Sequence, residues 1–200
     1  MYADMAFENS KKLFLSKKDK SNIGRIDAPI RELVDIINTK PCYFTTSSCS
    51  GRIMLLRHPP DGRKDRFEKL FVSHESVDAG AMIDLLRTKE TSSGLPEEEA
   101  WFRMEGLILH VCCRTIVDAE KLLDIARSSG IGLKRTGITS LGGKIIVEIL
   151  GTEILDCPIS KNKKLLVDDH YLELLIESAN KKLEKNRKKI EEIKKLISSL

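Results

Sequence analysis

The sequence predicts an α+β domain in which a mixed β-sheet is flanked by helices, and three observations support this class. Segments rich in β-branched and aromatic residues alternate with helical patterns along the chain. Hairpin signals such as Gly142-Gly143 occur among them, which argues against an all-parallel sheet. No G-x-G-x-x-G segment follows a strand pattern, so a Rossmann-type cofactor site is not expected.

The bulk composition is that of one folded domain over residues 1–200. The chain is 41% hydrophobic and 32% charged, with a net charge of +4, which permits an anionic partner such as RNA without requiring one. Its five cysteines form no C-x-x-C pair, and no stretch is apolar enough for a signal peptide or a membrane span. We therefore expect a cytoplasmic protein with reduced thiols and no metal site.

The first 40 residues predict two helices. Residues 6–20 have an amphipathic helical pattern that is basic on its polar side. Asp27 then precedes Ala28-Pro29, which indicates an N-cap with proline in the first turn. The second helix presents an apolar face, which consists of Ile30, Leu33, Val34 and Ile37.

The middle of the chain alternates strands with polar links. The expected elements are a strand at 42–46, a turn of small residues at 47–51, a strand at 52–56, an exposed charged loop at 58–66, a strand at 67–74, a helix from Asp78 to Arg87 and a polar link at 90–99.

The second half repeats this order of strands and a helix, which suggests an internal duplication. A buried central strand is predicted at 107–111, within the apolar stretch 101–113. A helix follows at 117–129, with Gly130 at its C-terminal end. Strands at 138–140, 144–150 and 152–154 then indicate a hairpin or meander.

A long basic helix is predicted from Asp168 or Asp169 to the C-terminus, over residues 168–200. Apolar or small residues recur at alternating steps of four and three, and only Asn186 interrupts them. The helix therefore either packs along the body of the protein or forms a coiled-coil contact, which would make a homodimer. The seam consists of Leu172, Ile176, Ala179, Leu183, Ile190, Ile193 and Ile197.

The segment Ser47-Ser48-Cys49-Ser50-Gly51-Arg52 is the first candidate for chemistry. A turn of small residues directs several N–H groups and hydroxyls at one anion, and an arginine fork binds a carboxylate or phosphate. The alternative is an ordinary serine-rich hairpin turn. Cys49 could be a nucleophile, but no histidine is near it in sequence, and a small buried side chain is the simpler interpretation.

Two histidines are candidates for a general base. His74 and His110 each lie in or directly after a predicted strand, and an imidazole titrates near neutral pH. Glu105 would support His110 if both faced the same side of the sheet. A structural role is the alternative for each histidine.

Phe44–Arg52 resembles the signature of the tRNA wybutosine-synthesizing protein 3 family. Further segments along the chain are similar to the same family, in order and over nearly its whole length. They are Lys17–Ser21, Gly24–Asp27, Ser73-His74, Glu105–Val111, Lys134–Ile138, Gly151–Glu153 and Ala179-Asn180.

The resemblance implies an S-adenosylmethionine-dependent methyltransferase without a Rossmann fold. Its substrate would be the tricyclic wyosine-type base beside the anticodon of tRNA(Phe), methylated at N4. No metal is implied. A non-catalytic tRNA- or RNA-binding protein is the alternative, and a thiol enzyme centred on Cys49 is a third.

The resemblance also implies roles for particular residues. The cofactor's charged end, or the amino-carboxypropyl group of the substrate, would be held by Ser48, Ser50, Gly51 and Arg52. The catalytic candidates are His74, His110 and Asp27. Contacts to the substrate and to the RNA stem are expected from Lys20, Arg25, Lys181, Lys185 and Lys188.

Overall fold

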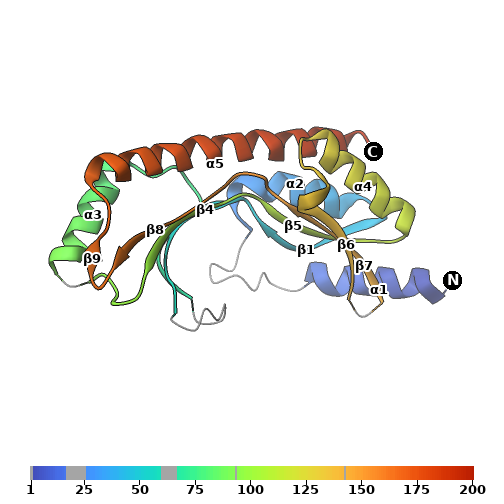
Figure 1. Ribbon diagram of the computed structural model, residues 1–200. Helices are drawn as coiled ribbons and strands as arrows, with labels where there is room; N and C mark the ends of the chain where they lie inside the picture. Colours follow the sequence, from blue (N-terminus) through green and yellow to red (C-terminus); the bar gives the residue numbers. More distant parts are fainter. Residues whose placement is uncertain (1, 17–25, 60–66, 93, 142) are drawn as a thin grey trace. The chain divides into compact units, whose positions relative to one another are not determined.

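The computed structural model describes residues 2–16, 26–59, 67–92, 94–141 and 143–200 (Figure 1). The chain divides into two compact units: residues 1–50, 107–152 and 186–200 form the first, and residues 51–106 and 153–185 form the second. The α+β class is confirmed. The described strands form two sheets with antiparallel pairing throughout, where the sequence predicts one mixed sheet.

The first unit has a four-stranded sheet in the order β1-β5-β7-β6. The strands are β1 (Tyr43–Cys49), β5 (Ile108–Cys113), β6 (Thr136–Leu141) and β7 (Lys144–Leu150). Its helices are α1 (Tyr2–Ser16), α2 (Ala28–Thr39), α4 (Ile116–Ser128) and the short 3-10 helix η2 (Leu133–Arg135).

Helices cover both faces of this sheet. The apolar faces of α2 and α4 pack with Tyr43, Val111 and Val147 in the larger core. Helix α1 lies on the opposite face (Figure 1). Its Phe7 packs there against Phe44 and Cys112. The predicted buried face of α2 is confirmed, and so is the hairpin of β6 and β7.

The second unit has a five-stranded sheet in the order β3-β2-β4-β8-β9. The strands are β2 (Arg52–Arg57), β3 (Glu68–Ser73), β4 (Ala100–Glu105), β8 (Ile154–Lys161) and β9 (Lys164–Leu165). Helix α3 (Ala79–Thr91) packs on one face, where Met82 and Leu86 join Ile53, Leu55 and Phe102 in the core. Asp78 caps α3 as predicted, by accepting the N–H of Ala81 at 2.8 Å.

Helix α5 (Asp169–Ser198) contributes residues to both units. Its predicted seam is buried: Leu172 to Leu183 belong to the core of the second unit, and Ile190 to Ile197 to the larger core of the first. The helix therefore packs along the chain's own strands, as the first of the two alternatives predicts. No helix among the described residues has the length and apolarity needed to cross a membrane.

Four expectations about strands differ from the structure in boundaries or partners. Strand β1 continues to Cys49, so the predicted turn at 47–51 shrinks to Ser50 and Gly51. The hairpin alternative is also wrong, since β1 pairs with β5 while β2 pairs with β3 and β4. The stretch 101–113 forms two strands in different sheets, and the strand expected at 152–154 begins only at Ile154. Residues 60–66 of the predicted loop lie outside the described residues.

Candidate active site

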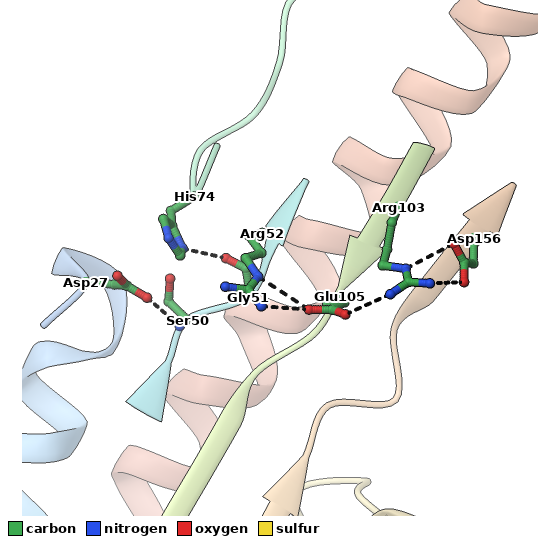
Figure 2. Close-up of polar contacts among 8 residues, drawn as sticks. All are labelled: Asp27, Ser50, Gly51, Arg52, His74, Arg103, Glu105 and Asp156. Atoms are coloured by element: carbon green, nitrogen blue, oxygen red, sulfur yellow. Dashed lines mark hydrogen bonds and ion pairs between the residues drawn. The ribbon is translucent and has the colours of Figure 1, made fainter. Parts of the chain in front are cut away.

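Asp27 holds the backbone at the end of β1. Its Oδ2 accepts the N–H of Ser50 at 2.9 Å (Figure 2), and Ser50 is fully buried. Asp27 does occupy the N-cap position of α2, but its side chain makes no cap hydrogen bond. The predicted N-cap position, with proline in the first turn, is therefore confirmed, but the carboxylate binds Ser50 rather than the first turn of α2.

A chain of hydrogen bonds continues from Ser50 through the first unit. The Ser50 carbonyl accepts a hydrogen bond from Nδ2 of Asn186 at 2.8 Å, and Oδ1 of Asn186 accepts the N–H of Leu107 at 2.7 Å. The Leu107 carbonyl in turn accepts the N–H of Gly151 at 2.7 Å. The segments that contain Ser50, Leu107 and Gly151 all resemble the family, and these hydrogen bonds link them. The side chain that joins the first two belongs to Asn186, which is fully buried.

His110 lies on the side of the β1-β5-β7-β6 sheet opposite the larger core. Directly paired residues of antiparallel strands share a face, so His110 shares one with Ser47 of β1 and Glu148 of β7. His110 Nε2 lies 2.9 Å from Glu148 Oε1, and the two side chains are 30% and 45% exposed. A carboxylate in contact with one ring nitrogen fixes the orientation of the imidazole.

Ser48 faces the other way. It is paired with Leu109, which lies in the larger core, so alternation places Ser48 on that face and Ser47 on the face of His110. The bulge at Thr46 sets this register, and Thr46 Oγ1 donates to the His110 carbonyl at 3.3 Å.

In the second unit, His74 binds the backbone that precedes β2. His74 Nδ1 lies 3.0 Å from the Gly51 carbonyl (Figure 2). A carbonyl only accepts, so Nδ1 carries the proton, and Nε2 is the basic atom of the neutral ring. Gly51 has φ +90°, a conformation that residues with a Cβ adopt only under strain.

Arg52 forms an ion pair with Glu105, its neighbour across β2 and β4. Arg52 Nε and Nη2 contact Oε2 of Glu105 at 3.3 and 3.1 Å (Figure 2). The expectation that Glu105 supports His110 is therefore wrong: the partner of His110 is Glu148, and Glu105 binds Arg52. No local signal indicates Glu148, because β5 and β7 are far apart in sequence.

The predicted RNA-binding residues divide into two groups. Lys181, Lys185 and Lys188 are exposed on α5, at spacings that place them on one face of the helix. Lys20 and Arg25 lie outside the described residues.

Burial makes the thiols of three described cysteines harder to ionise. Burial raises the pKa of Cys113 to about 12, and burial also raises the pKa of Cys112 and of Cys42. Cys49 is half-buried and paired with Ile108 across the sheet.

The fold and these polar contacts define an α+β protein outside the Rossmann class, and comparison with solved structures agrees. The structure described as PH1069 protein from Pyrococcus horikoshii superimposes with a TM-score of 0.85 at 32% identity, over 100% of both chains. A hypothetical protein from Aeropyrum pernix has a TM-score of 0.71 at 23% identity, over 86% of this chain and 98% of its own, and shows the fold alone.

Sequence relatives narrow the class to one family. The tRNA wybutosine-synthesizing protein 3 homolog of Danio rerio is 37% identical over 97% of this chain and 75% of its own length. A tRNA(Phe) 7-((3-amino-3-carboxypropyl)-4-demethylwyosine(37)-N(4))-methyltransferase 1 of Pyrococcus abyssi is 35% identical over 97% of both. The model of the family Methyltransferase TYW3 matches residues 8–199. The chain belongs to this family, which confirms the resemblance found in its sequence, and it is a methyltransferase that requires a methyl donor.

Proposed function

We propose that this protein methylates N4 of 7-(3-amino-3-carboxypropyl)-4-demethylwyosine at position 37 of tRNA(Phe), in wybutosine-derivative biosynthesis. The observation that carries the proposal is the similarity to the Pyrococcus abyssi enzyme of that name, which extends over 97% of each chain. We further propose that residues 1–200 act as one catalytic domain, in the cytoplasm.

The methyl donor in this proposal is S-adenosylmethionine, which supplies an electrophilic methyl group. Its methionine end carries a carboxylate, and the amino-carboxypropyl group of the base carries another. Arg52 fits such a group because Glu105 engages only Nε and Nη2, so Nη1 faces no partner among the described residues. Ser48, Ser50 and Gly51 remain proposed members of this binding segment. The backbone N–H and C=O of Ser50 are bonded to Asp27 and Asn186, so Ser50 acts by holding the segment in place.

His110 is the base that the local geometry favours. Removal of the ring proton needs an acceptor held in a fixed orientation, and the contact with Glu148 at 2.9 Å orients the imidazole of His110. His74 is the second candidate, with Nε2 as its basic atom. Asp27, the third predicted catalytic residue, acts by holding the N–H of Ser50.

The tRNA partner would be bound by the exposed lysines of α5, namely Lys181, Lys185 and Lys188. Lys20 and Arg25 remain predicted contacts to the substrate. A homodimer through α5 also remains a prediction, and it would require a face other than the buried seam, such as that of the exposed Leu174.

Transfer of labelled methyl from S-adenosylmethionine tests the proposal directly. The substrate is tRNA(Phe) that carries the unmethylated tricyclic precursor, with unmodified tRNA(Phe) as control and an Arg52→Ala variant alongside. We expect transfer to the precursor alone and a large loss in the variant. Binding of tRNA without transfer to either substrate would contradict the enzyme and favour a non-catalytic RNA-binding protein.

A further inference from the structure

Four charged side chains form a ladder on one face of the β2-β4-β8 part of the second sheet. Arg52 is paired with Glu105 across β2 and β4, and Arg103 is paired with Asp156 across β4 and β8. Glu105 and Arg103 are two residues apart on β4, so all four lie on the same face. Figure 2 shows them in the order Arg52, Glu105, Arg103, Asp156. We call these four residues the charge ladder.

The contacts within the charge ladder are unequal. Asp156 binds Arg103 in a bidentate manner, with Nε to Oδ1 at 3.0 Å and Nη2 to Oδ2 at 2.7 Å. Arg103 Nη1 lies 3.6 Å from Glu105 Oε1, while the other oxygen of Glu105 contacts Arg52. Asp156 thus occupies Nε and Nη2 of Arg103, so only Nη1 of Arg103 faces Glu105. That nitrogen lies near Oε1, and Oε2 of Glu105 is left to bind Arg52.

Partial burial strengthens the contacts within the charge ladder. The side chains of Arg52, Glu105, Arg103 and Asp156 are 25%, 30%, 22% and 34% exposed, so water screens their interactions only in part. Met54 lies opposite Arg103 on the same face and is buried. The hydrogen bonds and the ion pair with Asp156 raise the pKa of Arg103, which stays charged.

We infer that Arg103 and Asp156 are positioning residues for Arg52. They fix Glu105, and Glu105 fixes the guanidinium plane of Arg52 so that Nη1 is presented to an anionic group of a ligand. A bidentate or fork contact depends on this orientation, since a freely rotating guanidinium must lose more conformational entropy when it binds. The inference rests on the ligand-binding role proposed for Arg52.

The first test measures the order of Arg52 itself. Nitrogen-15 NMR relaxation of arginine Nε–H groups is compared in the wild type, Arg103→Met, Asp156→Asn and the control Arg87→Met. Arg87 is matched because it also forms ion pairs in the second unit, with Glu90 and Asp169 at 2.9 and 2.8 Å. We expect lower order at Arg52 in the two ladder variants and no change in the control. Unchanged order in both ladder variants would overturn the inference.

The second test is kinetic and uses the full chain with precursor tRNA. KM is measured separately for S-adenosylmethionine and for the precursor tRNA. In Arg103→Met and Asp156→Asn, we expect one of these KM values to rise about twofold to fivefold, as is typical of a partly exposed ion pair, with little change in kcat. A general loss of structure would lower kcat and the melting temperature instead. If the wild type shows no turnover, the proposed function fails, and the NMR comparison still decides the role of the ladder.

Discussion

At the residue scale, the division of roles between the two histidines is the most direct question. His110 contacts a carboxylate, whereas His74 contacts a backbone carbonyl. The first arrangement orients the ring through a side chain of a neighbouring strand, and the second fixes a tautomer. The two side chains should therefore respond differently to substitution.

We predict that His110→Ala lowers kcat by about 10²–10⁴-fold, the usual contribution of a general base. Glu148→Gln should cause a smaller loss, because the imidazole remains and the amide oxygen of glutamine can still contact Nε2. Single-turnover methyl transfer at saturating substrates measures both effects. His170→Ala is the control, since His170 is exposed in the first turn of α5. If the His110→Ala protein were fully active, His110 would not be the base, and His74 would be the remaining candidate.

We also predict that Cys49→Ala retains most of the methyl-transfer activity. Transfer of a methyl group to nitrogen requires no covalent thiol intermediate, and Cys49 is a half-buried strand residue opposite Ile108. The assay compares its initial rate with that of Arg52→Ala, which should be strongly impaired. The reverse pattern, an inactive Cys49→Ala with an active Arg52→Ala, would support a thiol-dependent enzyme.

At the element scale, Asn186 explains why a polar residue interrupts the seam of α5. Buried amides are stable only when their donors and acceptors are satisfied, and Asn186 satisfies backbone groups of Ser50 and Leu107. The sequence shows the interruption but not the partners, because both lie far from Asn186 along the chain.

We predict that Asn186→Leu destabilises the protein although it completes an apolar seam. The change leaves a buried C=O and a buried N–H without partners, at about 1–3 kcal/mol each. Chemical denaturation measures the loss. Asn180→Leu is the matched control: Asn180 also binds a backbone N–H and C=O, those of Val77 at 2.9 and 2.8 Å, but it is only half-buried, so water can replace it. A stabilised Asn186→Leu protein would show that the amide is merely tolerated.

In this chain, local sequence patterns predict the helices and strands well, but they predict poorly which strands pair with one another. The face of α2, the cap of α3 and the seam of α5 follow from periodicity and capping chemistry, which act over a few residues. The assignment of strands to two sheets depends on the short links at Ser50-Gly51 and Gly106-Leu107, where the chain leaves one sheet and enters the other. Periodicity contains no information about such partners, and for this reason Glu148 and the charge ladder were not predictable.

At the scale of the whole molecule, the match over residues 8–199 means that family membership concerns nearly the entire chain. Both units contain segments that resemble the family, and both contain candidate site residues: Asp27, Ser50 and His110 in the first, Gly51, Arg52 and His74 in the second. The tRNA substrate adds a requirement for a positively charged surface that binds its phosphates.

We propose that the exposed lysines of α5 supply this surface, and their contribution to binding can be separated from chemistry by its dependence on salt. We predict that the triple variant Lys181→Gln, Lys185→Gln, Lys188→Gln binds precursor tRNA more weakly, with a higher KM for tRNA. Each lost phosphate contact should reduce the slope of log K against log salt by about 0.7–0.9. Glutamine preserves helix propensity, so α5 itself should remain folded. The charge-matched control replaces Lys12, Lys121 and Lys164, which are exposed on α1, α4 and β9, and it should leave the slope unchanged. An equal loss of slope in both triple variants would mean that binding follows net charge rather than this face of α5.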